Sequence, residues 1–554
     1  MTGRRGAGLL LAIAATALFL RWTGIDYGLP QVFNSDEPHH VSVAVSFGRG
    51  SLDPGVFKYP TLWMYVLFAA YGVYFLLWSG LGLLHSAREF GELFVRDPAG
   101  FYLLARALAA ALSLAAVYAV YRAGEKRIGL WAGALLAVSP TLIVSAHAAK
   151  PESLMLLWSA LAFGCALRYL TGGRERMLWL CGAGVGLAVS TQYNAAPLAA
   201  LVPAAWWARR IAGGKSARRP GAKEWAELAR AAAWIPAAFL LGSPYVLLNW
   251  SAFYRDALDH MMLNALGRPA GGIVLYNAAR FAGQAAVGAV LLLAGAWHLA
   301  RHDRPRAVVL LVPTACVLLG IGLAPEGYWE RYLLAAYPAL ALIAAYGVEA
   351  AAARVKRIPL DDRAVRAVVA AGLMLPGALQ SHAHNRALLL PDTRTLSTQW
   401  VEHHIPPGAS VLIDQDHASP RLGYSRAQAE ELLETTRAAG HPRAAYYRLM
   451  VSGHPGGGYR VQQILRDYAD LHSGGWHTSW SAQGRSMIDV RPGLQAARAA
   501  GVEYVVLTSF GARLDRSPEL VSFLRETELR GTLLKEFRGI PGVTSGPRIR
   551  IYRI

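Results

Sequence analysis

The chain has 554 residues, of which 54% are hydrophobic and only 16% are charged. Soluble domains carry about 25% charged residues, so the composition excludes a single soluble globule. The formal net charge of +19 could indicate a nucleic-acid partner, but residues 1–384 hold 34 Lys and Arg against 20 Asp and Glu, whereas residues 385–554 hold 21 against 16. Most of the excess therefore lies beside apolar segments, where it reports membrane topology.

Apolar runs recur from the N-terminus to about residue 382 and then stop. A run of about 20 residues crosses roughly 30 Å of hydrocarbon as a helix. Candidate spans are residues 7–23, 102–120, 129–146, 153–170, 177–191, 193–208, 231–249, 275–299, 307–323, 333–350 and 366–382. The first run could be a signal peptide, but no small-residue cleavage site follows it, so we count it as a span.

A further apolar run, residues 61–84, decides the orientation, because each extra crossing reverses every later loop. If it does not cross, the segments on the inner side hold 22 Lys and Arg residues. The segments on the outer side hold only 8 Lys and Arg residues, although the longest loop is one of them. The positive-inside rule thus favours eleven crossings, a cytoplasmic N-terminus and an extracytoplasmic C-terminus. Residues 61–84 are then a juxtamembrane or re-entrant hairpin in the outer loop 24–101.

The chain beyond residue 384 has the pattern of a small α/β domain. Helical patterns cover residues 395–405, 425–439 and 459–472, and strand patterns cover 410–414, 502–508, 531–537 and 548–553. The glycine-rich stretch 452–459 indicates a loop. We therefore expect two domains: a transmembrane catalytic domain, residues 1–384, and a soluble extracytoplasmic α/β domain, residues 385–554.

The three cysteines all fall inside apolar runs, so they offer neither a disulfide framework nor a metal site: Cys165, Cys181 and Cys316. Polar residues that are unusual in so apolar a chain gather at the outer ends of the predicted spans. Ionisable groups at membrane depth are costly and usually functional. The polar residues at the outer ends of the spans are Asp36, Glu37, His39, His40, Lys58, Tyr59, Arg106, His147, Lys150, Glu152, Gln192, Tyr193, Asn194, Tyr245, Arg280, Glu326 and Arg331.

Some of these residues also have a purely structural explanation. Ser35 or Asp36 can cap a helix whose first turn holds Pro38, and the acidic pair then interacts with the helix dipole. Arg106 and Arg280 can extend to the membrane interface as anchors. Lys150 and Glu152 can belong to a tight turn. Acidic and basic groups from six separate segments on one face nevertheless favour a joint site.

Two neighbouring histidines follow the acidic pair, which raises the question of a metal site. His39 and His40 do not share a helix face, so they disfavour a two-histidine metal site with Glu37. The sequence requires no cofactor, although it allows a divalent cation.

The order of these motifs resembles a known superfamily. The sequence has an Asp-Glu pair after the first span, then KYPTLWMY, an arginine before the next span, SPTLIVSAHAAKPESL, GLAVSTQYNA, SPYVLLN and ERYLLAAYP. This set resembles the C-type (GT-C) membrane glycosyltransferases, and in particular bacterial glycosyltransferase family 39, which includes protein-mannosyltransferase-like and aminoarabinose-transferase-like enzymes. The segment PDTRTLSTQWVEHHIPPGA is similar to the start of their periplasmic domain. The resemblance covers residues 1 to about 415.

The resemblance implies roles for individual residues. Asp36 matches the catalytic carboxylate that deprotonates the acceptor hydroxyl, and Glu37 matches its acidic neighbour, which orients a substrate or holds a divalent ion in some members. The positions near the polyprenyl-phosphate head group are Lys58, Tyr59, Arg106, Lys150 and Arg331. Gln192, next to Tyr193, replaces a lysine of many relatives, and Glu152 replaces a common aspartate.

The function implied is an inverting glycosyltransferase that moves a sugar from a polyprenyl-phosphate donor to an acceptor hydroxyl. The sugar could be hexosyl or mannosyl-like, or aminoarabinosyl-like. The expected location is the outer face of the bacterial cytoplasmic membrane, where nucleotide sugars are not available. The acceptor could be a glycan, a lipid or a protein, and no nucleic acid is expected. The alternative is a polytopic transporter or a flippase for lipid-linked glycans, although such proteins place polar groups near the bilayer midplane and show repeats.

Overall fold

The computed structural model describes residues 4–125, 127–266, 286–322, 330–355, 362–414, 417–441, 443–465, 486–510 and 518–554. The chain forms two compact units. Unit 1 consists of Met1–Ile25, His40–Ala69 and Leu104–Asn385, and unit 2 consists of Asp26–His39, Ala70–Leu103 and Arg386–Ile554. The C-terminal residues therefore share a unit with two segments of the predicted outer loop.

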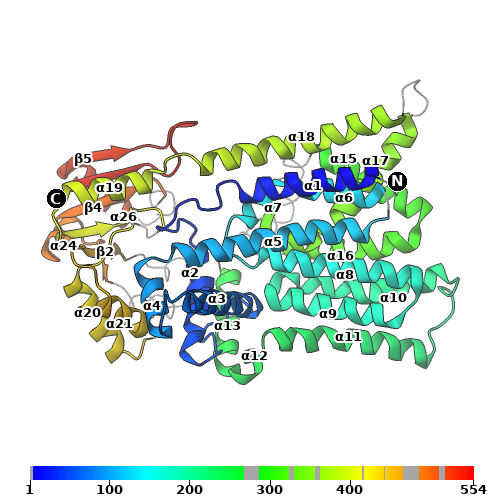
Figure 1. Cartoon of the computed structure of the whole chain (residues 1–554), viewed down its shortest axis with the longest axis horizontal. Helices are drawn as coiled ribbons and strands as arrows, with labels where there is room; N and C mark the ends of the chain where they lie inside the picture. Colours follow the sequence, from blue (N-terminus) through cyan, green and yellow to red (C-terminus); the bar gives the residue numbers. More distant parts are fainter. Residues whose placement is uncertain are drawn as a thin grey trace. The chain divides into compact units, whose positions relative to one another are not determined.

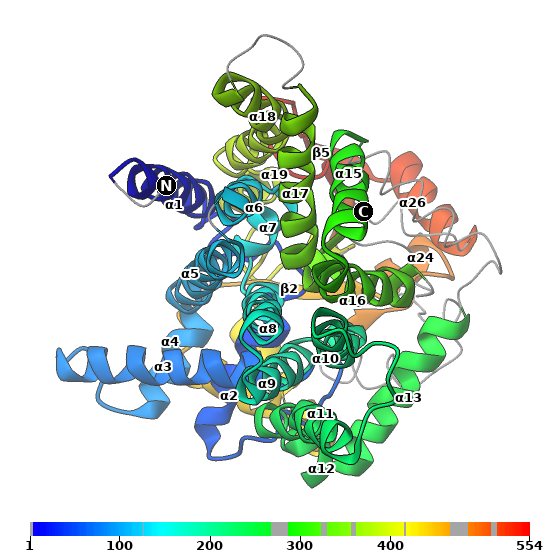
Figure 2. The ribbon, with the colours of Figure 1, turned by 90° about the vertical axis from the view of Figure 1, so that its right-hand side faces the viewer.

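Unit 1 is helical. Four of its helices also have residues in unit 2: α2 (Glu37–Ser46), α3 (Leu62–Gly80), α5 (Ala99–Ala123) and α18 (Asp362–Leu388). The others are α1 (Arg4–Trp22), η1 (Phe47–Arg49), α6 (Arg127–Ala137), α7 (Pro140–Ala146), α8 (Glu152–Gly172), α9 (Glu175–Thr191), η2 (Tyr193–Ala200), α10 (Leu201–Ala212), α11 (Ala222–Gly242), α12 (Tyr245–Leu248), α13 (Trp250–Leu266), α15 (Ala286–His302), α16 (Arg304–Gly322), η3 (Glu330–Ala336) and α17 (Tyr337–Val355). Figure 2 shows many of these helices end-on.

Each of the eleven predicted spans falls on a helix or a helix pair, although residues 275–285 lie outside the described part. Four helical stretches in the described part are long and apolar enough to cross a membrane: Leu62–Gly80, Ala99–Ala123, Glu152–Gly172 and Arg331–Ala353. The pair α6 and α7, bent by 59°, raises this number to five if it counts as one span. The total of eleven crossings therefore stays a prediction.

Helix α3 lies on the run 61–84, which we expect not to cross. It meets the length and composition test for a span. However, its first part belongs to unit 1 and runs across the direction of α8 and α9, as Figures 1 and 2 both show. This direction supports a helix that lies along the membrane rather than across it.

Close packing of α9 on α11 depends on small residues four apart. A Cβ at Gly182 would lie 2.2 Å from the carbonyl oxygen of Ala231, and a Cβ at Gly186 would lie 2.2 Å from that of Ile235. Only glycine allows the two backbones to approach so closely. Such small-residue contacts are typical of helices that pack within membranes.

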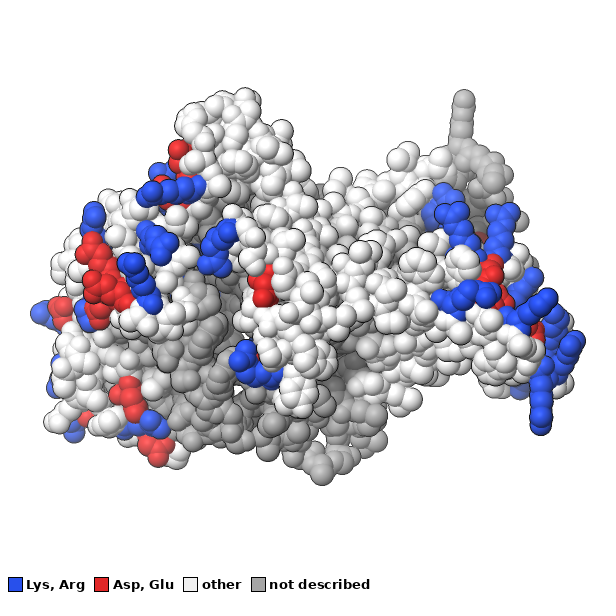
Figure 3. All heavy atoms as spheres, turned by 90° about the horizontal axis from the view of Figure 1, so that it is seen from below, with Lys and Arg blue, Asp and Glu red and all other residues white. Residues whose placement is uncertain are grey.

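The basic loops of unit 1 gather at one end of its helices. The turns between α8 and α9 and between α10 and α11 lie at the same end in Figure 1, and Figure 3 shows Lys and Arg side chains gathered there. The neighbouring surface of these helices shows no charged side chain in Figure 3. An uncharged surface beside a cationic end is what a helix bundle in a membrane requires.

Unit 2 contains a six-stranded sheet with the order β3-β2-β1-β4-β6-β5. Its strands are β1 (Ser410–Ile413), β2 (Arg460–Ile464), β3 (Met487–Ile488), β4 (Tyr504–Thr508), β5 (Thr532–Phe537) and β6 (Ile549–Arg553). Strands β1 to β4 pair in parallel, and β6 pairs antiparallel with β4 and β5. The helices of this unit are α4 (Ala87–Arg96), α19 (Thr393–His404), α20 (Arg426–Ala438), α21 (Ala444–Ser452), α24 (Leu494–Ala499) and α26 (Pro518–Arg530).

Alternate residues of the strands enter two different cores. Val411 and Val506 pack with Val401 of α19, whereas Leu412 and Val505 pack on the other core with α26. This alternation follows from the period of two along a strand. The sheet therefore has helices on both faces.

The four predicted strands of this region are present as β1, β4, β5 and β6, and the helical patterns at 395–405 and 425–439 are present as α19 and α20. The predicted helix at 459–472 is wrong in its described part. Residues Arg460–Ile464 form β2, which pairs with β1 and β3, and residues 466–472 lie outside the described part. Val461 and Ile464 have helical spacing, but sheet pairing on both sides overrides that local preference.

Candidate active site

The acidic pair stands at the start of helix α2. The helix begins at Glu37, so Asp36 is the residue directly before it, and Pro38 is its second residue, as the capping pattern predicts. The backbone N–H of Asp36 donates to Asn34 Oδ1 at 3.0 Å. Glu37 is fully buried, with 0% exposure, whereas Asp36 is half-buried. The two carboxylates are thus in different environments, and solvent reaches only Asp36.

C-terminal residues of unit 2 hold the segment that leads to Asp36. Arg421 Nη1 donates to the carbonyl oxygen of Pro30 at 3.0 Å. The guanidinium of Arg394 lies 3.6 Å from the centre of the Phe33 ring and forms an ion pair with Asp392 at 2.7 Å. An arginine over an aromatic face adds a cation–π attraction to this packing.

The same segment contains a strained residue. Buried Val32 adopts a φ of 57°, which costs a β-branched residue on the order of 1–3 kcal/mol. Its N–H donates to the carbonyl of Gly28 at 2.7 Å, and Thr395 Oγ1 donates to the neighbouring Gln31 Oε1 at 2.8 Å. These contacts hold the backbone in an unfavourable conformation four residues before Asp36, as is common near functional sites.

In unit 1, hydrogen bonds hold the segment 57–61 at both ends. The N–H of Phe57 donates to Asp256 Oδ2 at 2.6 Å. The N–H of Thr61 donates to Ser243 Oγ at 3.2 Å. Helix α3 begins directly afterwards, so the Lys-Tyr-Pro motif between these anchors has a fixed path.

Tyr59 and Lys58 belong to this motif. The rings of Tyr59 and His40 meet edge to face with centroids 4.7 Å apart, and Lys58 Nζ lies 6.0 Å from the centre of the Tyr59 ring. Lys58 is exposed, and His40 is buried. The motif thus presents an exposed cation beside an aromatic ring that packs on His40.

Arg106 lies on α5 and is fully buried, with 0% exposure. Its Nη1 donates to the carbonyl oxygen of Ile25 at 2.9 Å. Full burial excludes the alternative that Arg106 extends to the interface as an anchor. Arg280 lies outside the described residues, as does Glu326.

Lys150 and Glu152 form an ion pair at 3.1 Å, with side chains that are 9% and 2% exposed. Glu152 is the first residue of α8. Trp63 Nε1 donates to the carbonyl oxygen of Ala149 at 3.2 Å and fixes the turn before this pair. The Lys-Pro-Glu turn therefore contains a buried ion pair and not two solvated charges.

Gln192 and Tyr193 stand where α9 ends and η2 begins, and Arg331 lies in η3. Asn194 Nδ2 approaches the carbonyl oxygen of Tyr332 at 3.4 Å. Helix η3 also packs on α8 and η2. Unit 1 thus brings together the segments of Lys150 and Glu152, of Gln192 and Tyr193, and of Arg331.

Several buried polar atoms near these segments have no hydrogen-bond partner within the described ranges. They are Glu152 Oε2, Gln192 Oε1, Tyr193 Oη and Asn194 Oδ1. More than nine in ten buried polar groups in proteins are satisfied. A group of unsatisfied oxygens at adjoining helix ends is consistent with a place where a polar substrate binds.

Asp36, Glu37 and His39 belong to unit 2, and the other predicted site residues within the described part belong to unit 1. Among the residues that the structure describes, no group of three or more His, Cys, Asp or Glu could hold a metal ion. Sequence reasoning missed Asp256, Arg394 and Arg421, because nothing in their local sequence indicates which loop backbone they bind.

Comparison with known proteins adds two findings. The family model described as "Dolichyl-phosphate-mannose-protein mannosyltransferase" matches residues 90–240. The fold is similar to that of ArnT from Cupriavidus metallidurans, with a TM-score of 0.55 for the apo state and 0.51 for the state bound to undecaprenyl phosphate. Both likenesses have 14% identity and cover 99% of this chain and 98% of that chain.

A further likeness is to the oligosaccharyltransferase AglB from Archaeoglobus fulgidus, with 13% identity and a TM-score of 0.45, over 91% of this chain and 69% of that chain. The search of curated proteins found no match. The predicted resemblance to C-type membrane glycosyltransferases is confirmed by the family model and by the ArnT fold. Together with the apolar helices, these findings describe a multi-pass membrane protein.

Proposed function

We propose that the chain is a glycosyltransferase that moves a sugar from a polyprenyl-phosphate donor to an acceptor hydroxyl. The observation that carries the proposal is the half-buried carboxylate of Asp36 at the start of α2, in a chain that also buries the cations Arg106 and Lys150. The ArnT fold supports it, and so does the match of residues 90–240 to mannosyltransferases.

The chemistry needs one base and several cations. In the proposed reaction, Asp36 takes the proton of the acceptor hydroxyl while the oxygen of that hydroxyl attacks the anomeric carbon. The bond from that carbon to the phosphate oxygen breaks, and the electron pair leaves with the phosphate. Arg106, Lys150 and Arg331 stabilise the charge that develops there. Attack from the side opposite the phosphate inverts the anomeric centre.

The other site residues take supporting roles in this proposal. Glu37 orients a substrate, Lys58 and Tyr59 contact the head group, and Glu152 holds Lys150 in place. Gln192 and Tyr193 supply neutral hydrogen-bonding groups. No step of the proposed reaction uses a metal ion.

The similar proteins support a polyprenyl-phosphate donor. One ArnT structure is bound to undecaprenyl phosphate, and the matching family is named for dolichyl-phosphate mannose. A phosphate already linked to the sugar is a good leaving group, so the site needs no strong general acid. We assign no specific sugar or acceptor.

We further propose that the reaction takes place at the outer face of a bacterial cytoplasmic membrane. The gathering of basic loops at one end of the unit 1 helices supports this orientation, with that end in the cytoplasm. In this proposal residues 1–384 form the membrane domain, and residues 385–554 form an extracytoplasmic domain.

The test is the fate of a defined donor. The purified full-length chain in liposomes, given a polyprenyl-phosphate sugar and cell-envelope acceptors, should release free polyprenyl phosphate and yield a glycosylated acceptor with inverted anomeric configuration. A transporter or flippase would move the donor across the bilayer and leave its sugar–phosphate bond intact. Recovery of intact, translocated donor would therefore overturn the proposal.

A further inference from the structure

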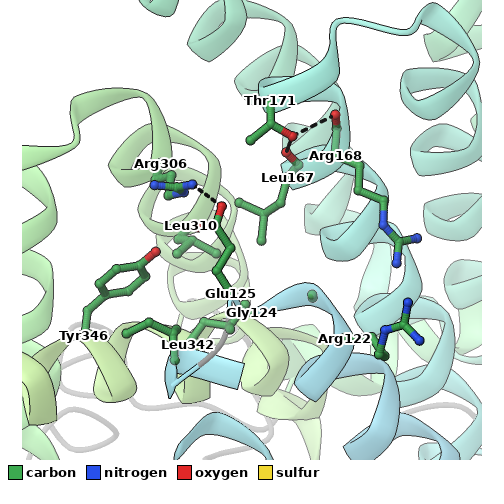
Figure 4. A pocket seen from close by; sticks show the side chains of 12 residues that line it. Arg122, Gly124, Glu125, Leu167, Arg168, Thr171, Arg306, Leu310, Leu342 and Tyr346 are labelled. Carbon is green, nitrogen blue, oxygen red and sulfur yellow. Dashed lines mark hydrogen bonds and ion pairs between the residues drawn. The ribbon is translucent and has the colours of Figure 1, made fainter. Parts of the chain in front are cut away.

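A polar cavity lies in unit 1, where α5, α6, α8, α16 and α17 meet. It has a volume of about 170 Å³. Its polar lining consists of Arg122, Glu125, Arg168, Thr171, Arg306 and Tyr346, which Figure 4 shows around the cavity. None of these residues belongs to the candidate active site.

The cavity is far from the active-site residues of the same helix. Glu152 begins α8, and Arg168 and Thr171 lie in its last turns. At about 1.5 Å per residue, 16 to 19 residues of helix span roughly 24–28 Å. The two places are therefore at opposite ends of α8.

The lining has an excess of positive charge. It contains three arginines and one glutamate. Arg306 already forms ion pairs with Glu125 and with Asp303, the latter at 2.6 Å. Its charge is thus compensated within the protein.

The other two arginines are not compensated in this way. Arg122 Nη1 donates to the hydroxyl of Tyr118 at 3.1 Å, which is a neutral partner. Arg168 forms no side-chain hydrogen bond or ion pair with any residue that the structure describes. Figure 4 shows both guanidinium groups on the same side of the cavity. Both side chains are exposed, so an anion at the mouth of the cavity can reach either guanidinium group.

The rest of the lining is apolar. Leu310 and Leu342 are buried, and Leu167 and Ile128 also contribute. A cationic rim over an apolar floor suits a molecule with a charged head and a hydrocarbon body. Its lining residues Arg168 and Thr171 lie in the last turns of α8, next to the turn between α8 and α9 at the basic end of the bundle. In the proposed orientation this end faces the cytoplasmic leaflet, where anionic lipids would meet the cavity.

We propose that this cavity binds the phosphate ester of an anionic glycerophospholipid head group, with Arg122 and Arg168 as the phosphate ligands. A guanidinium presents paired N–H donors that match phosphate oxygens in a way that lysine does not. The apolar floor then contacts the glycerol and the first part of the acyl chains. The inference does not depend on the proposed transferase activity.

The test uses native mass spectrometry of the purified full-length chain, titrated with phosphatidylglycerol or with phosphatidylcholine. The parent chain should bind one phosphatidylglycerol at least about ten-fold more tightly than phosphatidylcholine. The double variant Arg122→Gln/Arg168→Gln should lose this preference, because each charge-assisted hydrogen bond adds on the order of three- to ten-fold or more.

Two matched variants sharpen the test. Arg174→Gln/Arg176→Gln removes the same charge from exposed residues at the start of α9 that do not line the cavity, and it should keep the parental preference. Arg122→Lys/Arg168→Lys keeps the charge but removes the paired donors, so its preference should be intermediate.

The remaining outcomes overturn the proposal. Equal losses in both glutamine double variants would mean that surface charge alone attracts the lipid. Displacement of bound phosphatidylglycerol by an excess of inorganic phosphate would assign the cavity to a soluble anion. Binding of inorganic phosphate alone as tightly as phosphatidylglycerol would have the same meaning. A parent chain without lipid preference would leave the cavity without a lipid ligand.

Discussion

Asp36 and Glu37 are neighbours in sequence, but only Glu37 is fully buried. A residue that begins a helix turns its side chain in a different direction from the residue before it, so adjacent carboxylates need not share an environment. A general base must exchange its proton with a substrate, which favours the accessible Asp36. The buried Glu37 is better suited to orienting a substrate than to exchanging protons.

The buried pair of Lys150 and Glu152 gives a prediction at the scale of single residues. Lys150→Met leaves the carboxylate of Glu152 without its ion-pair partner in a buried place. Breaking one side of such a pair costs about 3–5 kcal/mol, so we expect a clear fall in the thermal unfolding temperature of the purified chain, measured by scanning calorimetry.

The double variant Lys150→Met/Glu152→Leu is the control, because it removes both charges and fills the space with apolar groups. It should recover much of the lost stability. An unfolding temperature that Lys150→Met leaves unchanged would mean that the pair is solvated in the protein, contrary to the structure.

At the scale of elements, long apolar runs in the sequence predicted most of the long helices of unit 1, because each such run must satisfy its backbone hydrogen bonds internally. Helix α13 was not predicted. The sequence also predicted β1, β4, β5 and β6 from short β-branched runs. It failed at Arg460–Ile464, since the pairing of β2 between two other strands is a long-range effect. The short strand β3 and helix α21 left no clear pattern.

The residues of the candidate site also divide into those that the sequence predicts and those that only the fold reveals. Charged residues at the ends of apolar runs, such as Lys150 and Arg106, are visible in the sequence because they are out of place there. Arg421 is one of many arginines in a polar region, and only the fold shows that it binds a carbonyl about 390 residues away. The cavity that Arg122 and Arg168 line is built from five helices, so the sequence does not reveal it for the same reason.

The contact of Arg421 with the segment before Asp36 gives a second prediction. Arg421→Ala should loosen this segment, so that hydrogen exchange at residues 26–36 becomes faster and kcat falls about three- to ten-fold with little change in KM, by the usual net worth of one hydrogen bond. Exchange mass spectrometry and donor-turnover kinetics measure the two effects.

Two variants serve as comparisons. Arg421→Lys should restore part of the rate. Arg426→Ala, which removes an exposed arginine that pairs with Glu430 along α20, should behave like the parent. If Arg421→Ala changes neither exchange nor kcat, the C-terminal residues do not position the acidic segment.

For the whole molecule, orientation decides which face carries the chemistry. On a background without the three native cysteines, Lys215→Cys should resist an impermeant thiol reagent in intact cells, because it lies in the basic turn between α10 and α11. Arg49→Cys and Glu434→Cys are exposed positions on the predicted outer side and should be labelled. Labelling of residue 215 from outside would reverse the proposed topology.

The most direct test of the central claim is the transfer rate of purified Asp36→Asn with a defined polyprenyl-phosphate sugar and acceptor. An amide of the same shape cannot take the acceptor proton, so we predict intact expression and donor binding and a loss of transfer on the order of 100-fold or more. Glu37→Gln, measured beside it, should have a milder effect. Transfer by Asp36→Asn at nearly the parental rate would contradict the mechanism and leave the acidic pair as a helix cap.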